Sequence, residues 1–136
     1  RGSGYVEASA LLKIYVEGTD SVEARRILAA EPRWTTGRHT LIEVRRNLAR
    51  LLDGATLERY RSVFDTHWAE TRVVELRADV CGRAAELAEL TGARTLDALH
   101  LGAADAAGAA DGLPIVTFDR RLADAARSLG WRVLPE

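Results

Sequence analysis

Apolar residues follow two alternating patterns along this chain. Short runs rich in β-branched and aromatic residues predict strands, and longer segments with apolar residues three or four positions apart predict helices. The strands are predicted at residues 5–7, 34–36, 72–76, 114–118 and 131–134. The helices are predicted at residues 10–16, 20–30 (ended by Glu31-Pro32), 40–51, 55–70, 78–90, 96–107 and 122–129.

The order of these elements points to one fold class. Strands alternate with helices, which implies a single α/β domain with a central parallel β-sheet and helices on both faces. The run from Pro114 to Phe118 is apolar almost throughout, as expected for a strand that is buried on both sides.

Composition fits one ordinary globular domain. The chain has 136 residues, of which 47% are hydrophobic and 29% charged. Residues 1–4 show no apolar pattern and are expected to be a cloning remnant, so that residues 5–136 form the domain. The single cysteine, Cys81, cannot form an internal disulfide, which favours a reduced, cytoplasmic protein, and its apolar surroundings predict that it packs in the core.

The charge balance gives a mixed indication about partners. A net charge of −1 does not match the basic surface of a stable nucleic-acid binder. However, the basic residues are all arginine except Lys13, and arginine suits bidentate contact with phosphate. Arg120 and Arg121 are therefore candidates for contacting RNA phosphates, although a solvated helix start explains them equally well, and coding bias explains the arginine excess better.

Four acidic residues are expected near the carboxyl ends of the strands, where ligands bind in parallel α/β sheets. Glu7 ends the first strand, and Asp119 directly follows the strand at 114–118. Glu43 and Asp97 fall in the first turns of helices that are expected to start at the same edge. All four carboxylates can therefore converge on one site.

Converging carboxylates repel one another unless some are protonated or a cation is bound. Oxygen ligands favour Mg²⁺ or Mn²⁺ over zinc, and such an ion can activate water and stabilise charge during displacement at phosphorus. The pattern thus favours metal-assisted phosphodiester hydrolysis.

Each of these residues also has a purely structural explanation. Thr40 and Glu43 fit the capping-box pattern at a helix start, and Ser9 is expected to cap the helix at 10–16. Asp97 and Asp119 lie near helix N-termini, where the helix dipole favours any acid. The joint placement of the four acids, rather than any one of them, favours function.

Four ordered segments resemble the motifs of the PIN-domain family and, within it, of VapC toxins. These are YVEASAL at 5–11, TLIEV at 40–44, TLDALHL at 95–101 and TFDRRL at 117–122. The third segment is the most specific, and the resemblance extends from about Gly4 to Pro135.

The resemblance implies a PIN-like fold and a Mg²⁺- or Mn²⁺-dependent endoribonuclease, the toxin of a type II toxin–antitoxin system. It implies that Glu7, Glu43, Asp97 and Asp119 form the metal-binding and catalytic set. Ser9 and Thr117 would support this set through hydrogen bonds. Its implied partners are the RNA substrate, a second copy of the chain and a VapB-like antitoxin.

One departure from the family pattern concerns the first acid, which is Glu7 where the family has aspartate. The additional methylene displaces the carboxylate, and a misplacement of about 1 Å can cost about 10²-fold in rate. The substitution is either natural or an engineered attenuation. The alternative function is accordingly a catalytically weak domain that binds RNA or an antitoxin.

Other functions and residues fit less well. Receiver domains and haloacid-dehalogenase-type phosphatases resemble this pattern but need a later lysine, and none follows Lys13. The P-loop and Rossmann glycine patterns are also missing. His100 follows Asp97 by three residues, for which a structural role is favoured over substrate contact, and His39 and His67 are assigned no role.

Overall fold

The computed structural model describes residues 4–30 and 33–136, so the predictions about residues 1–3 and about a helix end at 31–32 lie outside the described residues. Its strands form one parallel sheet in the order β3-β2-β1-β4-β5. The strands are β1 (Tyr5–Val6), β2 (Thr35–Gly37), β3 (Arg72–Val74), β4 (Ile115–Val116) and β5 (Val133–Leu134). The predicted fold class is confirmed.

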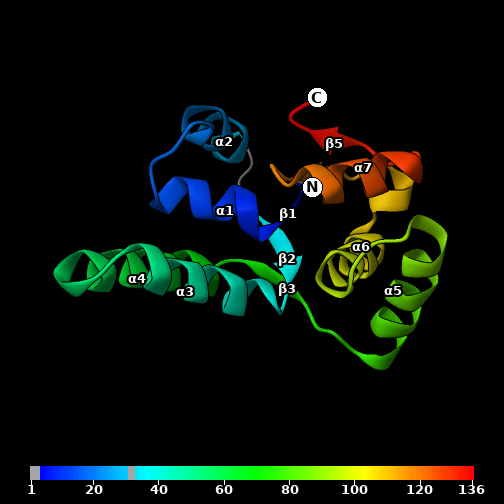
Figure 1. Ribbon diagram of the computed structural model, residues 1–136, viewed down its shortest axis with the longest axis horizontal. Helices are drawn as coiled ribbons and strands as arrows, with labels where there is room; N and C mark the ends of the chain where they lie inside the picture. The colour runs from blue at the N-terminus through cyan, green and yellow to red at the C-terminus, as the bar shows by residue number, and fades with distance from the viewer. Residues whose placement is uncertain (1–3, 31–32) are drawn as a thin grey trace.

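Helices cover both faces of this sheet, as Figure 1 shows. They are α1 (Ala8–Tyr15), α2 (Ser21–Ala29), α3 (Thr40–Leu51), α4 (Gly54–Ala69), α5 (Ala78–Thr91), α6 (Thr95–Ala107) and α7 (Arg120–Ser128), with a short 3₁₀ turn, η1 (Ala109–Asp111), before β4. The predicted strands and helices are therefore present, most of them with bounds shifted by a residue or two.

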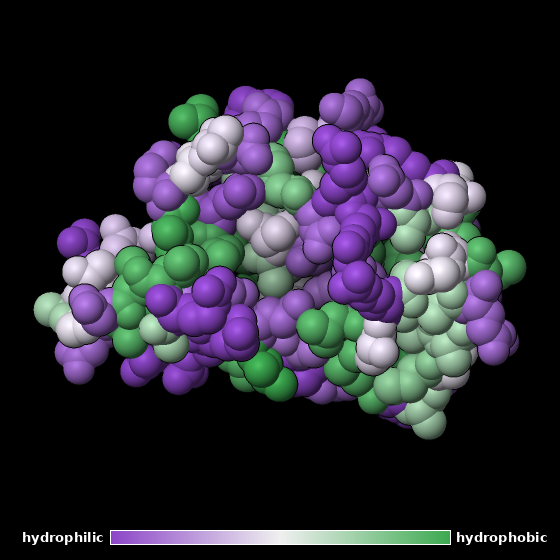
Figure 2. All heavy atoms as spheres, in the orientation of Figure 1, coloured by the Kyte–Doolittle hydropathy of each residue, from purple (hydrophilic) through white to green (hydrophobic). Residues whose placement is uncertain are grey.

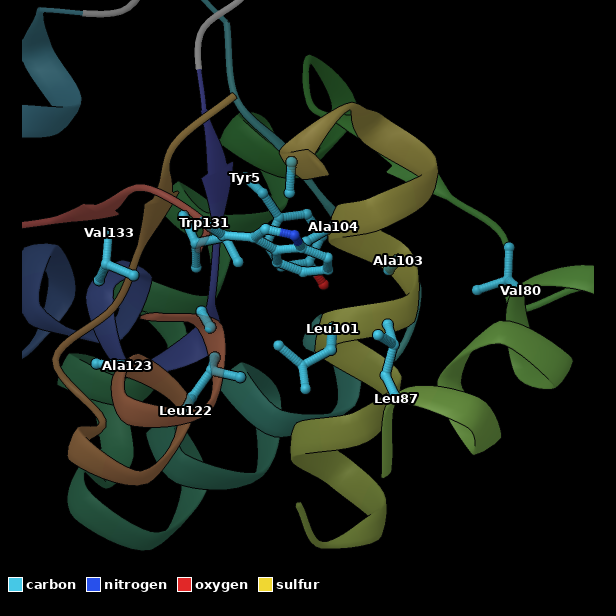
Figure 3. Close-up of a cluster of buried hydrophobic side chains, with 13 residues drawn as sticks. Tyr5, Val80, Leu87, Leu101, Ala103, Ala104, Leu122, Ala123, Trp131 and Val133 are labelled. Atoms are coloured by element: carbon cyan, nitrogen blue, oxygen red, sulfur yellow. The ribbon is translucent and has the colours of Figure 1, made fainter. Parts of the chain in front are cut away.

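The two faces carry separate apolar cores because neighbouring residues of a strand point to opposite sides. Tyr5 and Ile115 belong to the core beneath α5, α6 and α7, which Figure 3 shows around the rings of Tyr5 and Trp131. Val6 and Val116 belong to the core on the opposite face, beneath α1, α3 and α4. The central strands are thus buried on both sides, as the sequence predicted.

The carboxyl ends of the strands form the edge that positions the candidate site. Three helices, α1, α3 and α7, begin there directly after β1, β2 and β4. α6 follows α5, as predicted, and so the rule that a helix starts where the preceding strand ends does not place it. The chain continues from α6 through η1 into β4, and β4 starts at the opposite edge of the sheet. The first turn of α6 therefore lies near the carboxyl ends of the strands.

Two predicted helix caps are wrong. Ser9 does not cap the first helix, because the helix begins at Ala8 and its N-cap is Glu7. Thr40 is the first residue of α3 and not its cap; its hydroxyl pairs with Thr36 Oγ1 at 2.7 Å, and no side-chain cap bond forms at this helix start.

Cys81 is exposed rather than packed in the core. The buried residues of α5 are Val80, Ala84 and Leu87, spaced four and three apart, so Cys81 falls on the adjacent, solvent-facing side. Within the ranges 4–30 and 33–136, no helix is long and apolar enough to cross a membrane.

Candidate metal and active site

Glu7 lies at the junction of β1 and α1 and is 5% exposed. Its Oε1 accepts hydrogen bonds from Ser9 Oγ at 2.5 Å and from Thr117 Oγ1 at 2.6 Å. Each hydroxyl in turn accepts a backbone N–H from the loop after β4: Ser9 Oγ from Phe118 at 2.9 Å, and Thr117 Oγ1 from Asp119 at 3.0 Å. The Glu7 carboxylate is thus fixed by two hydroxyls whose own positions are fixed by the backbone.

Glu43 is fixed by a different kind of contact. It lies in the first turn of α3, and its Oε1 pairs with His100 Nε2 of α6 at 2.8 Å. The other imidazole nitrogen, Nδ1, pairs with the hydroxyl of Tyr5 at 2.7 Å. His39 lies against His100 with the ring centres 4.0 Å apart. A buried aromatic cluster therefore supports this side of the site.

Asp119 and Asp97 complete the set of acids from α7 and α6. Asp119 is the N-cap of α7, and its Oδ1 accepts the backbone N–H of Arg121 at 2.9 Å and of Leu122 at 3.3 Å. Burial raises the pKa of Asp97, and the charge of nearby Asp119 raises it further; His100 opposes this rise, and Glu7 and Glu43 add to it. The Asp97 carboxyl thus feels the charge of all three other acids.

Two donor sets can be compared: the four acids, which the sequence predicts as metal ligands, and one cluster of ligand atoms that lie close together in the described part of the chain. The four carboxylates offer only oxygen ligands, which suit Mg²⁺ or Mn²⁺. Glu43, His39 and His100 form a second set, with ligand atoms within 4.8 Å of one another. In this second set both nitrogens of His100 are already engaged, with Tyr5 and with Glu43. The acidic set is therefore the better fit for a hard cation.

Arginines line the hollows on both sides of α7. One hollow contains Thr117 and Asp119 together with Arg120, Arg127 and Arg132. The other contains Asp97 together with Arg94 and Arg121. In Figure 2, hydrophilic side chains gather over the region of α7. Asp124 lines both hollows and Glu136 lines the first, so neither hollow is positive overall, and the arginines offer individual phosphate contacts beside the acids.

The structure places all four predicted acids at the same end of the sheet and puts Ser9 and Thr117 in contact with Glu7. Their roles in catalysis remain predictions. Sequence reasoning missed Tyr5 and His39 altogether, and it underrated His100, which contacts an acid of the site. The three-residue spacing of Asp97 and His100 was the available signal, because such residues are neighbours on a helix surface.

The structure defines a parallel α/β domain with acidic residues at the carboxyl end of its sheet, and comparison with known proteins gives the family. The PIN domain model matches residues 4–128, so the chain belongs to the PIN-domain family. It is 35% identical to Ribonuclease VapC45 of Mycobacterium tuberculosis (strain CDC 1551 / Oshkosh), covering 96% of this chain and 94% of the relative. Within the family it is thus a VapC-type ribonuclease.

Solved structures support the fold independently. The structure of Mycobacterium tuberculosis VapC20, a sarcin-ricin loop cleaving toxin, superposes with a TM-score of 0.70 at 20% identity, covering 90% of this chain and 95% of that one. A toxin–antitoxin complex from Klebsiella pneumoniae gives a TM-score of 0.68 at 17% identity, covering 86% and 87% of the two chains. At these identities the likeness concerns the fold alone.

Proposed function

We propose that this VapC-type ribonuclease is a Mg²⁺- or Mn²⁺-dependent toxin that cleaves RNA phosphodiester bonds at the pocket of Glu7, Glu43, Asp97 and Asp119. One observation supports the proposal above the others. Burial raises the pKa of Asp97, and the charges of Asp119, Glu7 and Glu43 raise it further, so the four acids lie near enough to influence one another. A divalent cation would relieve the repulsion among their charges.

Different residues have different roles in the proposed site. Glu7 and Glu43 present carboxylates whose positions are fixed by Ser9, Thr117 and His100. Asp97 and Asp119 complete the oxygen ligands that would hold the ion. When bound, the metal supplies an activated water and stabilises the charge that develops at phosphorus.

Substrate positioning falls to α7 in this proposal. Arg120 lines the same hollow as Asp119, and Arg121 lines the same hollow as Asp97. Guanidinium groups at these positions can hold the phosphates on either side of the scissile bond by charge-assisted hydrogen bonds. Specificity for one RNA would then depend on the shape of the groove and on unpaired nucleotides.

The proposal extends to partners. A structural neighbour of this chain is a toxin–antitoxin complex, which favours a VapB-like antitoxin as the inhibitor of this chain. Large hydrophobic side chains are exposed at Val22, Ile42, Leu90 and Leu96, which is consistent with surfaces for an antitoxin and for a homodimer. We assign the protein to the cytoplasm, where its RNA substrate is found.

RNA cleavage in the presence and absence of metal tests the proposal directly. The purified chain and an Asp97→Ala variant are incubated with total bacterial RNA in Mg²⁺, Mn²⁺ or EDTA. We expect discrete fragments from the unmodified chain with metal only, and none from Asp97→Ala. Folded protein that produces no fragments under any of these conditions would contradict the nuclease proposal for these RNAs.

A Glu7→Asp variant separates the nuclease from the alternative of a weakly catalytic binding module. If the longer side chain attenuates the site, shortening it raises the cleavage rate by up to about 10²-fold, the cost of a misplacement of about 1 Å. If RNA or antitoxin binding persists while neither protein cleaves, the binding module is favoured instead.

A further inference from the structure

A continuous chain of buried hydrogen bonds runs from the sheet to one of the acids of the pocket. The backbone N–H of Gly37 in β2 donates to the hydroxyl oxygen of Tyr5 in β1 at 3.0 Å. That hydroxyl pairs with His100 Nδ1 at 2.7 Å, and His100 Nε2 pairs with Glu43 Oε1 at 2.8 Å. Tyr5 and His100 are 0% and 1% exposed, so the first two bonds are shielded from water, and the third reaches an acid that is 21% exposed.

The direction of each bond follows from its donors. Burial raises the pKa of the Tyr5 phenol far above its usual range, so the hydroxyl keeps its proton. Because the phenol oxygen already accepts the Gly37 N–H, its own proton is free to point to His100 Nδ1. An imidazole that accepts at Nδ1 carries its proton at Nε2. That proton then points to the Glu43 carboxylate.

We propose that His100 is a positioning residue that holds the Glu43 carboxylate, as an Nε2–H donor whose tautomer is set by Tyr5. This inference rests on the proposed function, because it assigns Glu43 to the metal-binding set. The imidazole donates one hydrogen bond to Oε1, which stops the glutamate from turning away from the pocket. Residues that orient a ligand in this way commonly affect metal affinity by about 10- to 100-fold.

The packing around the imidazole shows that its position is fixed as well as its tautomer. The His39 ring covers one side of His100, and both His39 nitrogens are buried without a hydrogen-bond partner among the described residues. A Cβ added at Gly37 would come within 2.9 Å of the Tyr5 hydroxyl and within 2.7 Å of His39 Cε1. Only glycine fits there, and its lack of a side chain lets Tyr5 and His39 approach β2.

Replacement of a histidine with only a structural role would have different consequences. A histidine that only fills the core contributes to stability, and its loss leaves the pocket geometry of a folded protein unchanged. The Tyr5 ring takes part in the core of Figure 3 in this way. Its hydroxyl, however, bonds to His100, and His100 bonds to an acid that is 21% exposed at the pocket.

Nitrogen NMR of the unmodified protein tests the tautomer without metal or substrate. In a ¹⁵N-labelled sample, we expect His100 Nε2 to show the shift of a protonated nitrogen and Nδ1 that of an unprotonated acceptor. In Tyr5→Phe, where the donor to Nδ1 is removed, this tautomer is expected to lose its dominance. A His100 that carries its proton at Nδ1 in the unmodified chain would overturn the proposal.

Mn²⁺ binding, measured by electron paramagnetic resonance, tests the positioning role. We expect His100→Ala to weaken Mn²⁺ binding about 10- to 100-fold. His100→Gln is expected to recover most of that loss, because its amide N–H can donate to Glu43. Leu87→Ala removes a buried side chain from the same core and serves as the control, with lower stability and unchanged Mn²⁺ binding.

The outcomes separate this proposal from the proposed function. If the unmodified chain binds Mn²⁺ and cleaves RNA while folded His100→Ala binds Mn²⁺ equally well, the positioning role is wrong and the nuclease proposal stands. Equal weakening in Leu87→Ala and His100→Ala would show a structural role only. If the unmodified chain neither binds Mn²⁺ nor cleaves RNA, both proposals fall.

Discussion

The two glutamates of the pocket, Glu7 and Glu43, are held by different means. Glu7 is 5% exposed and its Oε1 accepts the hydroxyls of Ser9 and Thr117, which are tied to the adjacent backbone. Glu43 is 21% exposed and receives its contact from His100, which depends on Tyr5. One side of the pocket is therefore held by short side chains near the loop after β4, and the other by buried rings from distant elements.

The contacts of Glu7 show how the domain accommodates a glutamate at a position where the PIN-domain resemblance implies an aspartate. The hydroxyls of Ser9 and Thr117 meet the carboxylate at the end of the longer side chain, so the charge is paired in its buried position. Both hydroxyls bind Oε1, and neither engages Oε2. The substitution therefore leaves no unpaired buried charge, and its consequence for catalysis is a matter of carboxylate position alone.

The largest effect is expected at Asp97, which is held neither by the hydroxyls of Ser9 and Thr117 nor by the imidazole of His100. Asp97→Asn should lower the RNA cleavage rate by about 10²- to 10³-fold, the typical loss when one preorganised electrostatic group is removed. A rate within tenfold of the unmodified chain would show that Glu7 and Glu43 carry the reaction without it. Single-turnover cleavage in Mg²⁺ measures this.

The same variant should gain stability. The raised pKa of Asp97 means that the folded state disfavours its charged form, so its stabilising effect is present at low pH and is lost as the pH rises through the folded-state pKa. A neutral amide removes this penalty at pH 7. We expect the melting temperature of Asp97→Asn to rise by a few degrees in metal-free buffer, and a fall would contradict the repulsion argument.

The support of Glu7 is tested by Thr117→Val, with a smaller expected effect. This change removes a donor to Glu7 and the acceptor of the Asp119 N–H at a site that is 3% exposed. Leaving such buried groups unpaired costs about 1–3 kcal/mol in the free energy of unfolding. We expect that loss together with roughly tenfold slower cleavage, since the misplacement of Glu7 would be below 1 Å.

Thr71→Val is the matched control for this prediction. Thr71 also uses its hydroxyl locally, donating to the His67 carbonyl at 2.8 Å at the end of α4, far from the acids in the sequence and on another element. It should lower stability slightly and leave the cleavage rate unchanged. Equal slowing by both variants would show that the hydroxyls at Glu7 act through stability alone.

The fold was predictable from the sequence because hydrophobic periodicity and strand alternation are local signals. The acids Glu7 and Asp119 were predictable for the same reason, since each directly follows a strand. Asp97 was placed at this edge by a rule for helices that follow strands, and that rule does not apply to α6, which follows α5 as predicted. The structure puts Asp97 at the same edge because the chain runs from the end of α6 through η1 into the start of β4.

The support of the acids was not predictable to the same degree. The pairing of Tyr5 with His100 joins residues 95 positions apart, and no periodic pattern connects them. The capping box at Thr40 and Glu43 was wrong for a related reason: Glu43 turns to His100, and Thr40 turns to Thr36. A capping box predicts bonds within one helix start, and here partners from other elements, β2 and α6, replace them.

A pH titration should locate the acid sensitivity of the domain on the Glu43 side, because the buried His39 imidazole lies there. Burial, with a smaller contribution from His100, lowers the pKa of His39 from 6.5 to about 4. The folded state therefore resists protonation, and stability is lost as the pH falls from about 6.5 toward 4. The expected loss in unfolding free energy is on the order of 2–3 kcal/mol.

His39→Phe keeps a ring against His100 and removes the titration. Urea unfolding between pH 4 and pH 7 should show a flatter stability profile for this variant than for the unmodified chain. His67→Phe, a histidine on α4 that pairs with Tyr15, is the control and should leave the slope in place. An unchanged slope in His39→Phe would assign the acid sensitivity to other groups.

The smallest expected effect concerns the approach of RNA, which we propose to run along α7. Arg120 lines the hollow of Thr117 and Asp119, on the Glu7 side of the site. Arg120→Ala should weaken RNA binding about threefold and lower the slope of log affinity against log salt by about 0.7, as for one lost phosphate contact to a single strand. Arg59→Ala on α4 removes an exposed arginine that lies over the Tyr60 ring and should change neither quantity. Equal effects of the two variants, measured by fluorescence anisotropy at several salt concentrations in Ca²⁺ or EDTA, would mean that RNA responds to net charge and not to a path along α7.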